Sequence, residues 1–413
     1  MRTVIRNLAL PVLLVLPALA VRISGTHVPP PVGLLVFGLA VVAASFVLAW
    51  AAEAAEMDIS GGLAVAILAV IAVLPEYAVD LFFAYRAGSD PAYVQYAAAN
   101  MTGSNRLLLG LGWSAVVLVS LAVVSRRSGK KVKEVVLEAG HRLEVGFLAI
   151  AALIAFIIPI SGQINIVLGV VLLAFFVFYL IRVGLAGEAS EPELVGPAAP
   201  IGALPTRIRR PVVIIMFTAA AVIIFLCAEP FAESLISSGK TLGVDEFLLV
   251  QWLAPLASEA PEFIVALIFA SRGNAVGALG MLISAKVNQW TLLIGSLPVA
   301  YLFGGGDGVL RLDARQIEEV LLTAAQTVLG VAILLALRFP RWAAYALLAL
   351  FAVQFAIPST TGRLILSGVY LVIAVVAVVI NRHHLWITLT TPFRRLPKEP
   401  QPSEPELESV TAR

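Results

Sequence analysis

The chain has 413 residues, of which 60% are hydrophobic and only 13% are charged, and its mean hydropathy is +0.97. Soluble domains carry about 25% charged residues, so this composition excludes an ordinary soluble protein and predicts an all-α polytopic membrane protein embedded in a lipid bilayer. The single cysteine excludes an intramolecular disulfide, and the net charge of +2 gives no reason to expect a nucleic-acid partner.

Apolar windows long enough to cross a hydrocarbon layer of about 30 Å occur along the whole chain. They fall at 8–22, 33–52, 62–86, 92–124, 145–160, 164–184, 210–229, 246–271, 275–302, 316–337, 342–357 and 364–381. These windows predict about 12 transmembrane helices. The window 92–124 is long enough to hold a broken helix and its continuation.

The basic residues predict the orientation of these helices. If the N-terminus is placed on one side, that side collects twenty of the 28 Lys and Arg residues, and the other side collects six. Because basic loops stay in the cytoplasm, we expect both termini there, in a bacterial-type inner (plasma) membrane. The two remaining basic residues, Arg106 and Lys286, fall inside apolar windows.

Two Pro-Glu pairs, Pro75-Glu76 and Pro261-Glu262, lie deep inside apolar stretches, one in each half of the chain. Ionisable groups inside a membrane are costly and therefore mark functional sites. Proline interrupts helical hydrogen bonding and frees backbone carbonyls that can face a cation. Five predicted crossings separate the two glutamates. Because five is an odd number, the copies run in opposite directions and form an inverted repeat.

The repeat suggests a division of the chain into segments. We expect two inverted repeats joined by a polar linker; two five-helix repeats with ten core helices and one extra helix at each end are what the family resemblance given below implies. The expected segments are an N-terminal extra helix that is retained rather than cleaved (1–32), a first repeat (33–184), a flexible cytoplasmic linker (185–209), a second repeat (210–357), and an extra helix with a poorly ordered cytoplasmic tail (358–413).

Each half presents two carboxylates on one helical face. Asp80 follows Glu76 by four residues, and Glu259 precedes Glu262 by three. Hard cations such as calcium prefer carboxylate oxygens, supplemented by hydroxyls and amides. We therefore expect Glu76 and Glu262 to be the primary ligands, with Asp80 and Glu259 tuning the site. The expected supporting oxygens are those of Ser104, Asn105, Asn288 and Gln289.

The intramembrane cations Arg106 and Lys286 are the expected charge partners of this site. Against four carboxylates they leave a balance of minus two, which one divalent ion, two monovalent ions or protons would neutralise. Lys286 has two interpretations. It is either a tethered cation that stands where a bound ion would sit, or a static charge pair with Glu259.

Taken together, Leu74-Pro75-Glu76, Gly103-Ser104-Asn105 and the second Pro261-Glu262 resemble the paired alpha-repeats of the cation/calcium exchanger superfamily. The resemblance covers about 33–357. It implies ten core helices in inverted halves, a midplane site built from the two repeat glutamates, and alternating access that exchanges calcium for sodium or protons.

The chain departs from the family pattern at two places. The family has Gly-Thr-Ser before Leu-Pro-Glu, whereas this chain has Ile71-Ala72-Val73, which carries no hydroxyls. The second Gly-Ser-Asn is replaced by a segment in which either Lys286 or Asn288 occupies the asparagine position. Several sodium ligands of the family therefore have no counterpart, which bears on the coupling ion.

These features predict a secondary cation antiporter that exchanges Ca²⁺ for Na⁺ or H⁺, with no cofactor and no enzymatic activity. One alternative is a proton-coupled antiporter of Na⁺ or another monovalent cation. An alternative of another class is a non-transporting membrane protein or a membrane enzyme. All four histidines lie outside the apolar windows, which argues against a haem protein or a histidine metal site.

Overall fold

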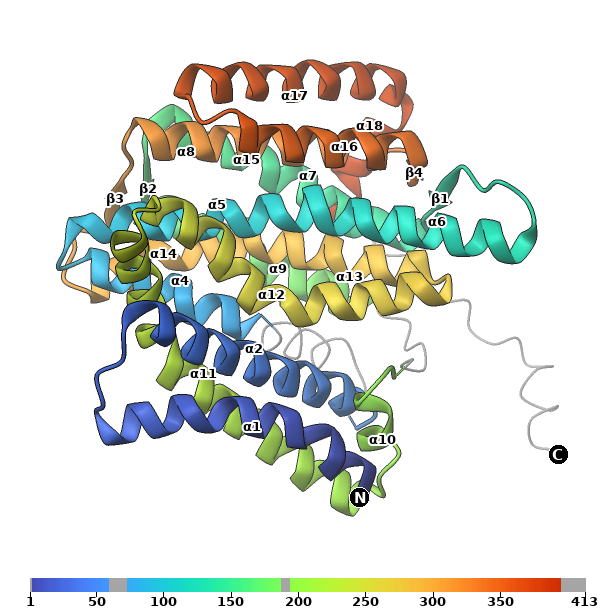
Figure 1. Cartoon of the computed structure of the whole chain (residues 1–413). Helices are drawn as coiled ribbons and strands as arrows, with labels where there is room; N and C mark the ends of the chain where they lie inside the picture. Colours follow the sequence, from blue (N-terminus) through green and yellow to red (C-terminus); the bar gives the residue numbers. More distant parts are fainter. Residues whose placement is uncertain (1, 59–72, 187–193, 395–413) are drawn as a thin grey trace, which may run out of the picture.

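A computed structural model of the chain describes residues 2–58, 73–186 and 194–394. The described residues are almost entirely helical, and the helices run side by side in several layers (Figure 1). Nine helices within these ranges are long and apolar enough to cross a membrane. The prediction of an all-α polytopic membrane protein is therefore confirmed, whereas the count of 12 spans stays a prediction.

The first half of the chain contains α1 (Arg2–Ser24), α2 (Pro30–Ala55), α4 (Leu74–Ala87), η1 (Pro91–Tyr93), α5 (Val94–Leu107), η2 (Leu108–Trp113), α6 (Ser114–Ser128), η3 (Ala139–His141), α7 (Arg142–Ala155), α8 (Ile157–Ser161) and α9 (Ile166–Ala186). Part of the predicted window 62–86 lies outside the described residues. The window 92–124, which is long enough to hold a broken helix and its continuation, is a continuous helical segment in which η2 joins α5 to α6.

The second half contains α10 (Ala198–Gly202), α11 (Thr206–Leu242), α12 (Glu246–Arg272), α13 (Ala275–Asn288), η4 (Gln289–Leu293), α14 (Ile294–Phe303), α15 (Ala314–Leu334), α16 (Arg341–Val353), η5 (Gln354–Ala356), α17 (Thr360–Ile380), α18 (Arg382–Thr390) and η6 (Thr391–Phe393). At the second Pro-Glu pair the helix does not end, because α12 continues through Pro255 and Pro261.

Both expected polar segments contain structure where they are described. In the linker, α10 packs against the end of α2, and Arg209 makes a two-pronged ion pair with Asp58 at 2.7 and 2.9 Å. Residues 187–193 of the linker lie outside the described residues. Beyond His383, α18 packs on α7, and Arg142 Nη1 donates to Thr388 Oγ1 at 2.9 Å. The described parts of these two segments are thus helical and packed against the bundle, and the predictions of a flexible linker and a poorly ordered tail stay predictions.

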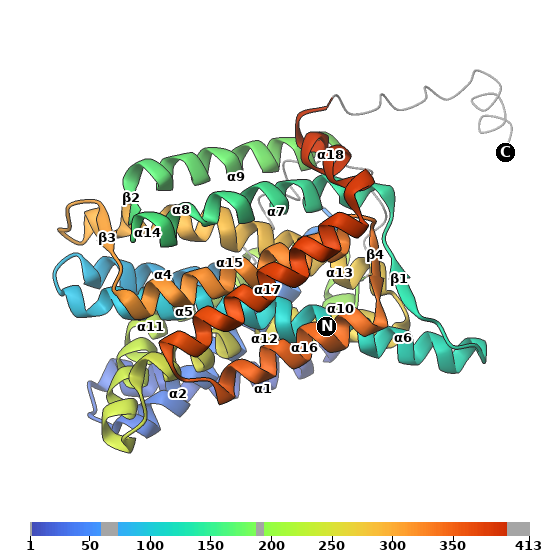
Figure 2. The same ribbon diagram turned by 90° about the horizontal axis from the view of Figure 1, so that it is seen from above.

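Two small antiparallel sheets join the halves of the chain. Strand β1 (Glu134–Val136) pairs with β4 (Arg338–Pro340), and β2 (Gln163–Asn165) pairs with β3 (Val309–Arg311). The two sheets lie at opposite ends of the helical bundle (Figures 1 and 2). Each sheet pairs an earlier loop of one half with a later loop of the other half, as an inverted repeat requires.

The two halves also share a local irregularity. In each, a long helical rod is interrupted by a π segment, η2 between α5 and α6 and η4 between α13 and α14. Asn105 lies shortly before η2, and Asn288 lies directly before η4. Such π segments occur frequently at functional sites, because they leave carbonyls free of their usual helical partners.

A close backbone contact fixes α5 against α12. Pro255 has no N–H, so the carbonyl of Gln251, four residues earlier, loses its helical partner. Gly103 packs on that carbonyl, and a Cβ at position 103 would lie 1.7 Å from Gln251 O. Any other residue at position 103 would therefore push α5 away from α12.

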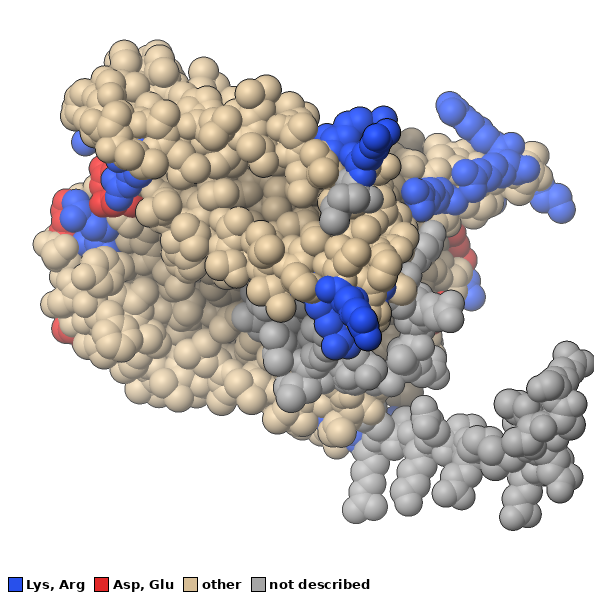
Figure 3. Space-filling view, turned by 90° about the horizontal axis from the view of Figure 1, so that it is seen from below, with Lys and Arg blue, Asp and Glu red and all other residues tan. Residues whose placement is uncertain are grey.

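The basic side chains gather at one end of the molecule. Figure 3 shows Lys and Arg clustered at the end where α6 projects, whereas acidic and basic groups are mixed at the opposite end. Arg126, Lys130 and Lys131, at the tip of α6 and in the turn after it, are exposed. This is the asymmetry from which the sequence predicts that this end faces the cytoplasm.

Candidate ion-binding site

Four buried side chains from four different helical segments meet between the halves. They are Glu76 on α4, Ser104 on α5, Glu259 on α12 and Gln289 on η4, and each is at most 4% exposed. Ser104 Oγ is in hydrogen-bond contact with Oε1 of Glu76 and with Oε1 of Glu259. Gln289 Nε2 donates to Ser104 Oγ at 2.7 Å, to Glu259 Oε1 at 2.8 Å and more weakly to Glu76 Oε1 at 3.3 Å.

Local sequence explains why Glu76 lies in this cluster. Pro75 occupies the first turn of α4, where its missing N–H costs nothing, and Glu76 follows directly. A carboxylate in the first turn is also stabilised by the positive end of the helix dipole. The Pro-Glu pair therefore places an acid at a helix N-terminus inside the membrane.

The bridging hydroxyl limits the charge of the cluster. Ser104 Oγ carries one hydrogen, which it can donate to only one of the two glutamates. Its contact with the second glutamate is a hydrogen bond only if that carboxyl group carries a proton and donates it to Ser104. Ser104 Oγ can therefore be hydrogen-bonded to both glutamates only when the Glu76–Glu259 pair holds at least one proton, as expected for two carboxylates that share one buried site.

The expectation that Glu76 and Glu262 are the primary ligands stays a prediction, but Glu259, and not Glu262, shares the Ser104 hydroxyl with Glu76 in the described residues. Residues three apart point about 60° away from each other around a helix, and the Glu259 side of α12 faces Ser104. Glu262 is partly buried and interacts electrostatically with both Glu76 and Glu259.

Three other predicted ligands lie outside this hydrogen-bonded cluster. Asp80 is fully buried one turn beyond Glu76, and neither of its oxygens accepts a hydrogen bond from the described residues. Asn105 Nδ2 donates to Met101 O in its own helix at 2.9 Å. Within the described ranges, the side-chain oxygens of Asn105 and Asn288 are buried without a donor. No hydrogen bond joins these oxygens to the cluster in the described residues.

Lys286 binds a backbone carbonyl rather than a carboxylate. Its Nζ donates to the carbonyl oxygen of Asn105, and the side chain is fully buried near the Trp290 ring. No carboxylate of the described residues lies within ion-pair distance of Lys286, so both interpretations of this residue stay predictions. Its charge still interacts with Glu259 and Glu76.

A matching contact exists in the other half. The hydroxyl of Tyr77 donates to the carbonyl of Asn288 at 3.3 Å. Each carbonyl near the start of a π segment is thus bound by a side chain from the opposite half: Lys286 binds Asn105, and Tyr77 binds Asn288. The sequence analysis missed Tyr77, although it directly follows the Pro-Glu pair.

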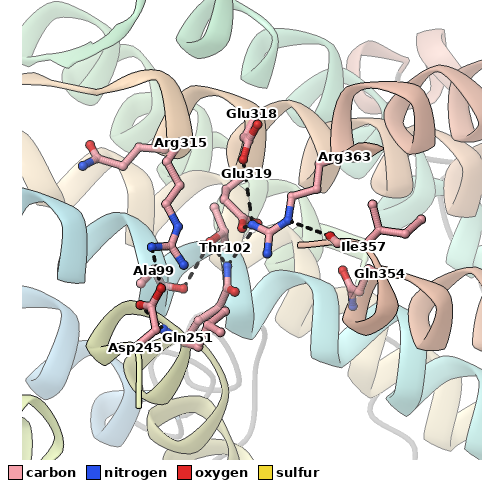
Figure 4. A network of polar contacts seen from close by, with 12 residues as sticks. Ala99, Thr102, Asp245, Gln251, Arg315, Glu318, Glu319, Gln354, Ile357 and Arg363 are labelled. Atoms are coloured by element: carbon pink, nitrogen blue, oxygen red, sulfur yellow. Dashed lines mark hydrogen bonds and ion pairs between the residues drawn. The ribbon is translucent and has the colours of Figure 1, made fainter. Parts of the chain in front are cut away.

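Arg106 belongs to a second buried cluster and not to the ion-binding cluster where it was expected. Its guanidinium group pairs with Glu319 on α15, donates to Gln354 Oε1 at 3.0 Å and stacks over Trp252 at 5.2 Å. Arg363, at the start of α17, pairs with the same Glu319. Figure 4 shows Arg363 and Gln251 reaching Glu319 from opposite sides.

The first cluster does not bring together a complete set of ligands for a metal ion. Across residues 2–58, 73–186 and 194–394, no three His, Cys, Asp or Glu side chains are grouped closely enough to hold a metal ion. The donors that do converge are oxygens of two carboxylates, one hydroxyl and one amide-bearing side chain. This chemistry suits protons and hard cations.

The comparison with protein families decides the identity of the chain. The model of the family described as "Sodium/calcium exchanger protein" matches residues 30–184 and 212–359. The chain belongs to this exchanger family. No curated protein sequence matches it.

Solved structures agree with this assignment. The structure entitled "Crystal Structure of H+/Ca2+ Exchanger CAX" is 42% identical to this exchanger, with a TM-score of 0.87, and the match covers 94% of this chain and 96% of that chain. The structure of native YfkE is 16% identical, with a TM-score of 0.59 and coverage of 88% and 98%. The sodium-calcium exchanger NCX_Mj is 18% identical, with a TM-score of 0.52 and coverage of 79% and 98%, which supports the fold alone.

The sequence analysis of this exchanger overlooked the second cluster. Glu318 and Glu319 lie in the apolar window 316–337, and Gln251 lies in 246–271. The reasoning that singled out Glu76, that a charge inside an apolar stretch marks a site, applies equally to Glu319. Arg363 lies just outside the predicted window 364–381, and it is 7% exposed at the start of α17.

Proposed function

We propose that the exchanger is a secondary antiporter that moves Ca²⁺ against H⁺ at the Glu76–Glu259 cluster. Membership of the exchanger family supports an antiporter for calcium and a counter-cation. The structure titled as an H⁺/Ca²⁺ exchanger, which is 42% identical over 94% of this chain, supports the proton as the counter-ion.

The observation that carries the proposal is the single Ser104 hydroxyl between two buried glutamates. In the arrangement described, the pair needs a proton. A divalent cation would bring enough positive charge to replace protons on Glu76 and Glu259, and its departure would restore them. Binding of Ca²⁺ and of H⁺ to the same oxygens is thus mutually exclusive, which is the requirement for exchange.

Two features argue against sodium as the counter-ion. Val73, directly before Leu74-Pro75-Glu76, has no hydroxyl that could bind sodium. Ile71 and Ala72, which precede it in the sequence, have none either, although they lie outside the described residues. The carbonyl of Asn105, an oxygen well suited to a monovalent cation, is occupied by the Lys286 ammonium. A tethered charge there competes with any free Na⁺.

The test is flux in proteoliposomes with a pH-sensitive dye inside and a calcium indicator outside. We expect an outward proton gradient to drive Ca²⁺ uptake, and added Ca²⁺ to release protons in the absence of sodium. Glu76→Gln is the inactive control. Calcium uptake driven by sodium without proton movement would overturn the proton assignment. Collapse of a pH gradient by sodium in the absence of calcium would indicate an antiporter of protons and a monovalent cation. Absence of all flux would indicate a non-transporting protein.

A further inference from the structure

The second buried cluster has a balanced set of charges. Glu319, which is 0% exposed, is contacted by Arg106 from α5, Arg363 from α17 and Gln251 from α12, whose Nε2 donates at 3.1 Å. Glu318 lies 4.0 Å from Arg363. Two arginines thus face two glutamates, and loss of any one partner leaves an uncompensated buried charge.

The cluster and the ion-binding site use the same pair of helices. Gln251 Nε2 donates to Thr102 Oγ1 at 3.2 Å, which joins α12 to α5. Eight residues further along α12, or about 12 Å, Glu259 contacts Ser104 on α5. Side-chain contacts therefore join α5 and α12 at two levels. Glu259 and Ser104 make one contact at the ion site, and Gln251 and Thr102 make the other nearer the start of α12.

Arg363 brings an additional helix into this contact. The family match ends at residue 359, so α17 lies beyond it. Arg363 nevertheless points inward to Glu319 (Figure 4), and its Nε donates to Ile357 O at 3.3 Å, which fixes the turn before α17. The outer face of α17 is apolar and exposed at Ile365, Val372 and Val379.

We propose that Glu319, clamped by Arg106 and Arg363, is a latch that keeps α5 and α12 closed on one side of the ion site. Arg363 and Glu319 are positioning residues, because they act on the site through these helices and do not contact the ion. The latch lies between Glu259 and the end of the bundle at which α12 and α17 begin. The distribution of basic residues predicts that this end faces outside the cell. Releasing it favours opening of the site toward that end.

Accessibility of the site tests the latch without depending on which ion is transported. Cys227 is replaced by Ala, and Ser258 by Cys. Ser258 precedes Glu259 and bonds only to carbonyls of its own helix, Ala254 O and Pro255 O. A membrane-impermeant cationic thiol reagent is then applied to oriented vesicles from the face opposite an N-terminal tag.

We expect Glu319→Gln and Arg363→Gln to increase the labelling rate of S258C by about fivefold or more, the effect of losing a buried ion pair. The double variant should give a similar increase and not the product of the two, because both changes release one latch. Arg315→Gln is the matched control. It breaks a nearby ion pair with Asp245, 2.8 Å long and partly exposed, and should leave labelling unchanged.

Equal labelling in wild type and Glu319→Gln, with both proteins monodisperse after purification, would overturn the latch. So would an equal increase in Arg315→Gln. The inference rests on the proposed function only in assuming a site that opens alternately to two faces. Absence of calcium flux with latch-dependent labelling would reject calcium exchange but keep the latch, whereas normal flux with unchanged labelling would reject the latch alone.

Discussion

Lys286 on α13 donates a hydrogen bond to the backbone carbonyl of Asn105 on α5. The contact joins the two halves of the molecule and places the Lys286 amino group where its charge interacts with Glu76 and Glu259. A lysine in this place offers a fixed substitute for a mobile monovalent cation. It explains how four acids can be gathered inside the membrane with fewer bound ions.

Replacement of Lys286 by Met should make the exchanger sensitive to sodium. The change frees the Asn105 carbonyl to bind a cation and removes the charge of Lys286. The neighbouring carboxylates should therefore bind a monovalent cation more tightly. We expect Na⁺ to inhibit radioactive calcium uptake in the variant but not in the wild type. Lys286→Arg is the control that keeps the charge. Calcium uptake by Lys286→Met that stays insensitive to Na⁺ would contradict the tethered-cation interpretation.

Glu259→Gln and Glu262→Gln should have different phenotypes. Glu259 shares Ser104 with Glu76, so its amide variant should lose exchange by on the order of 100-fold, the scale on which ligand charge tunes calcium affinity, and should alter the pH dependence of the residual activity. Glu262 acts through its charge alone in this arrangement. Its variant should raise the half-saturating calcium concentration and keep the wild-type pH profile.

The measurement is initial calcium uptake as a function of external calcium at several pH values, with each variant checked for expression and monodispersity. Identical pH profiles for wild type and Glu259→Gln would show that the Glu76–Glu259 pair does not carry the exchanged proton.

Tyr77→Phe should weaken the contact between the halves. The change removes the hydrogen bond to Asn288 O, so we expect a loss of about 0.5–1.5 kcal/mol in stability and slower exchange at saturating calcium. Tyr96→Phe is a matched control, because the Tyr96 side chain is buried and its hydroxyl makes no hydrogen bond to a described residue. Thermal unfolding in detergent measures the difference. An equal shift for both variants would mean that ring burial, and not the hydroxyl, matters.

The ion pair between Asp58 and Arg209 should fasten the linker in a pH-dependent manner. Hydrogen bonding to Arg209 lowers the pKa of Asp58 below its usual value. A carboxyl group with a lowered pKa stabilises the folded arrangement above its unfolded pKa of about 4, and this contribution is lost as the pH falls through the lowered value. Asp58→Asn should therefore speed proteolysis of the linker at pH 7, and the difference from wild type should vanish at strongly acidic pH.

Arg207→Gln is the control for this experiment, since Arg207 is exposed and makes no ion pair with a described residue. If Asp58→Asn and Arg207→Gln are cleaved at the same rate at pH 7, the Asp58–Arg209 pair does not hold the linker.

The sequence was sufficient to predict the helical membrane fold, the inverted repeat and the participation of Glu76, because each follows from composition or from the duplicated Pro-Glu pair. It was insufficient to decide between Glu259 and Glu262. That choice depends on the rotation of α12, which the contact between Gly103 and the Gln251 carbonyl fixes across 148 positions of the chain. The Lys286–Asn105 contact, 181 positions apart, is equally invisible to local patterns.

The two strand pairs constrain how this molecule can move. Strands β1–β4 and β2–β3 tie the halves together at opposite ends of the bundle, so the halves cannot slide past each other while both pairs stay intact. The movement that keeps both strand pairs intact is a rotation of one half relative to the other about the axis that joins the two pairs. The bundle of α1, α2 and α11 lies to one side in Figure 1 and carries none of these strands, so neither strand pair ties it to the rest of the molecule.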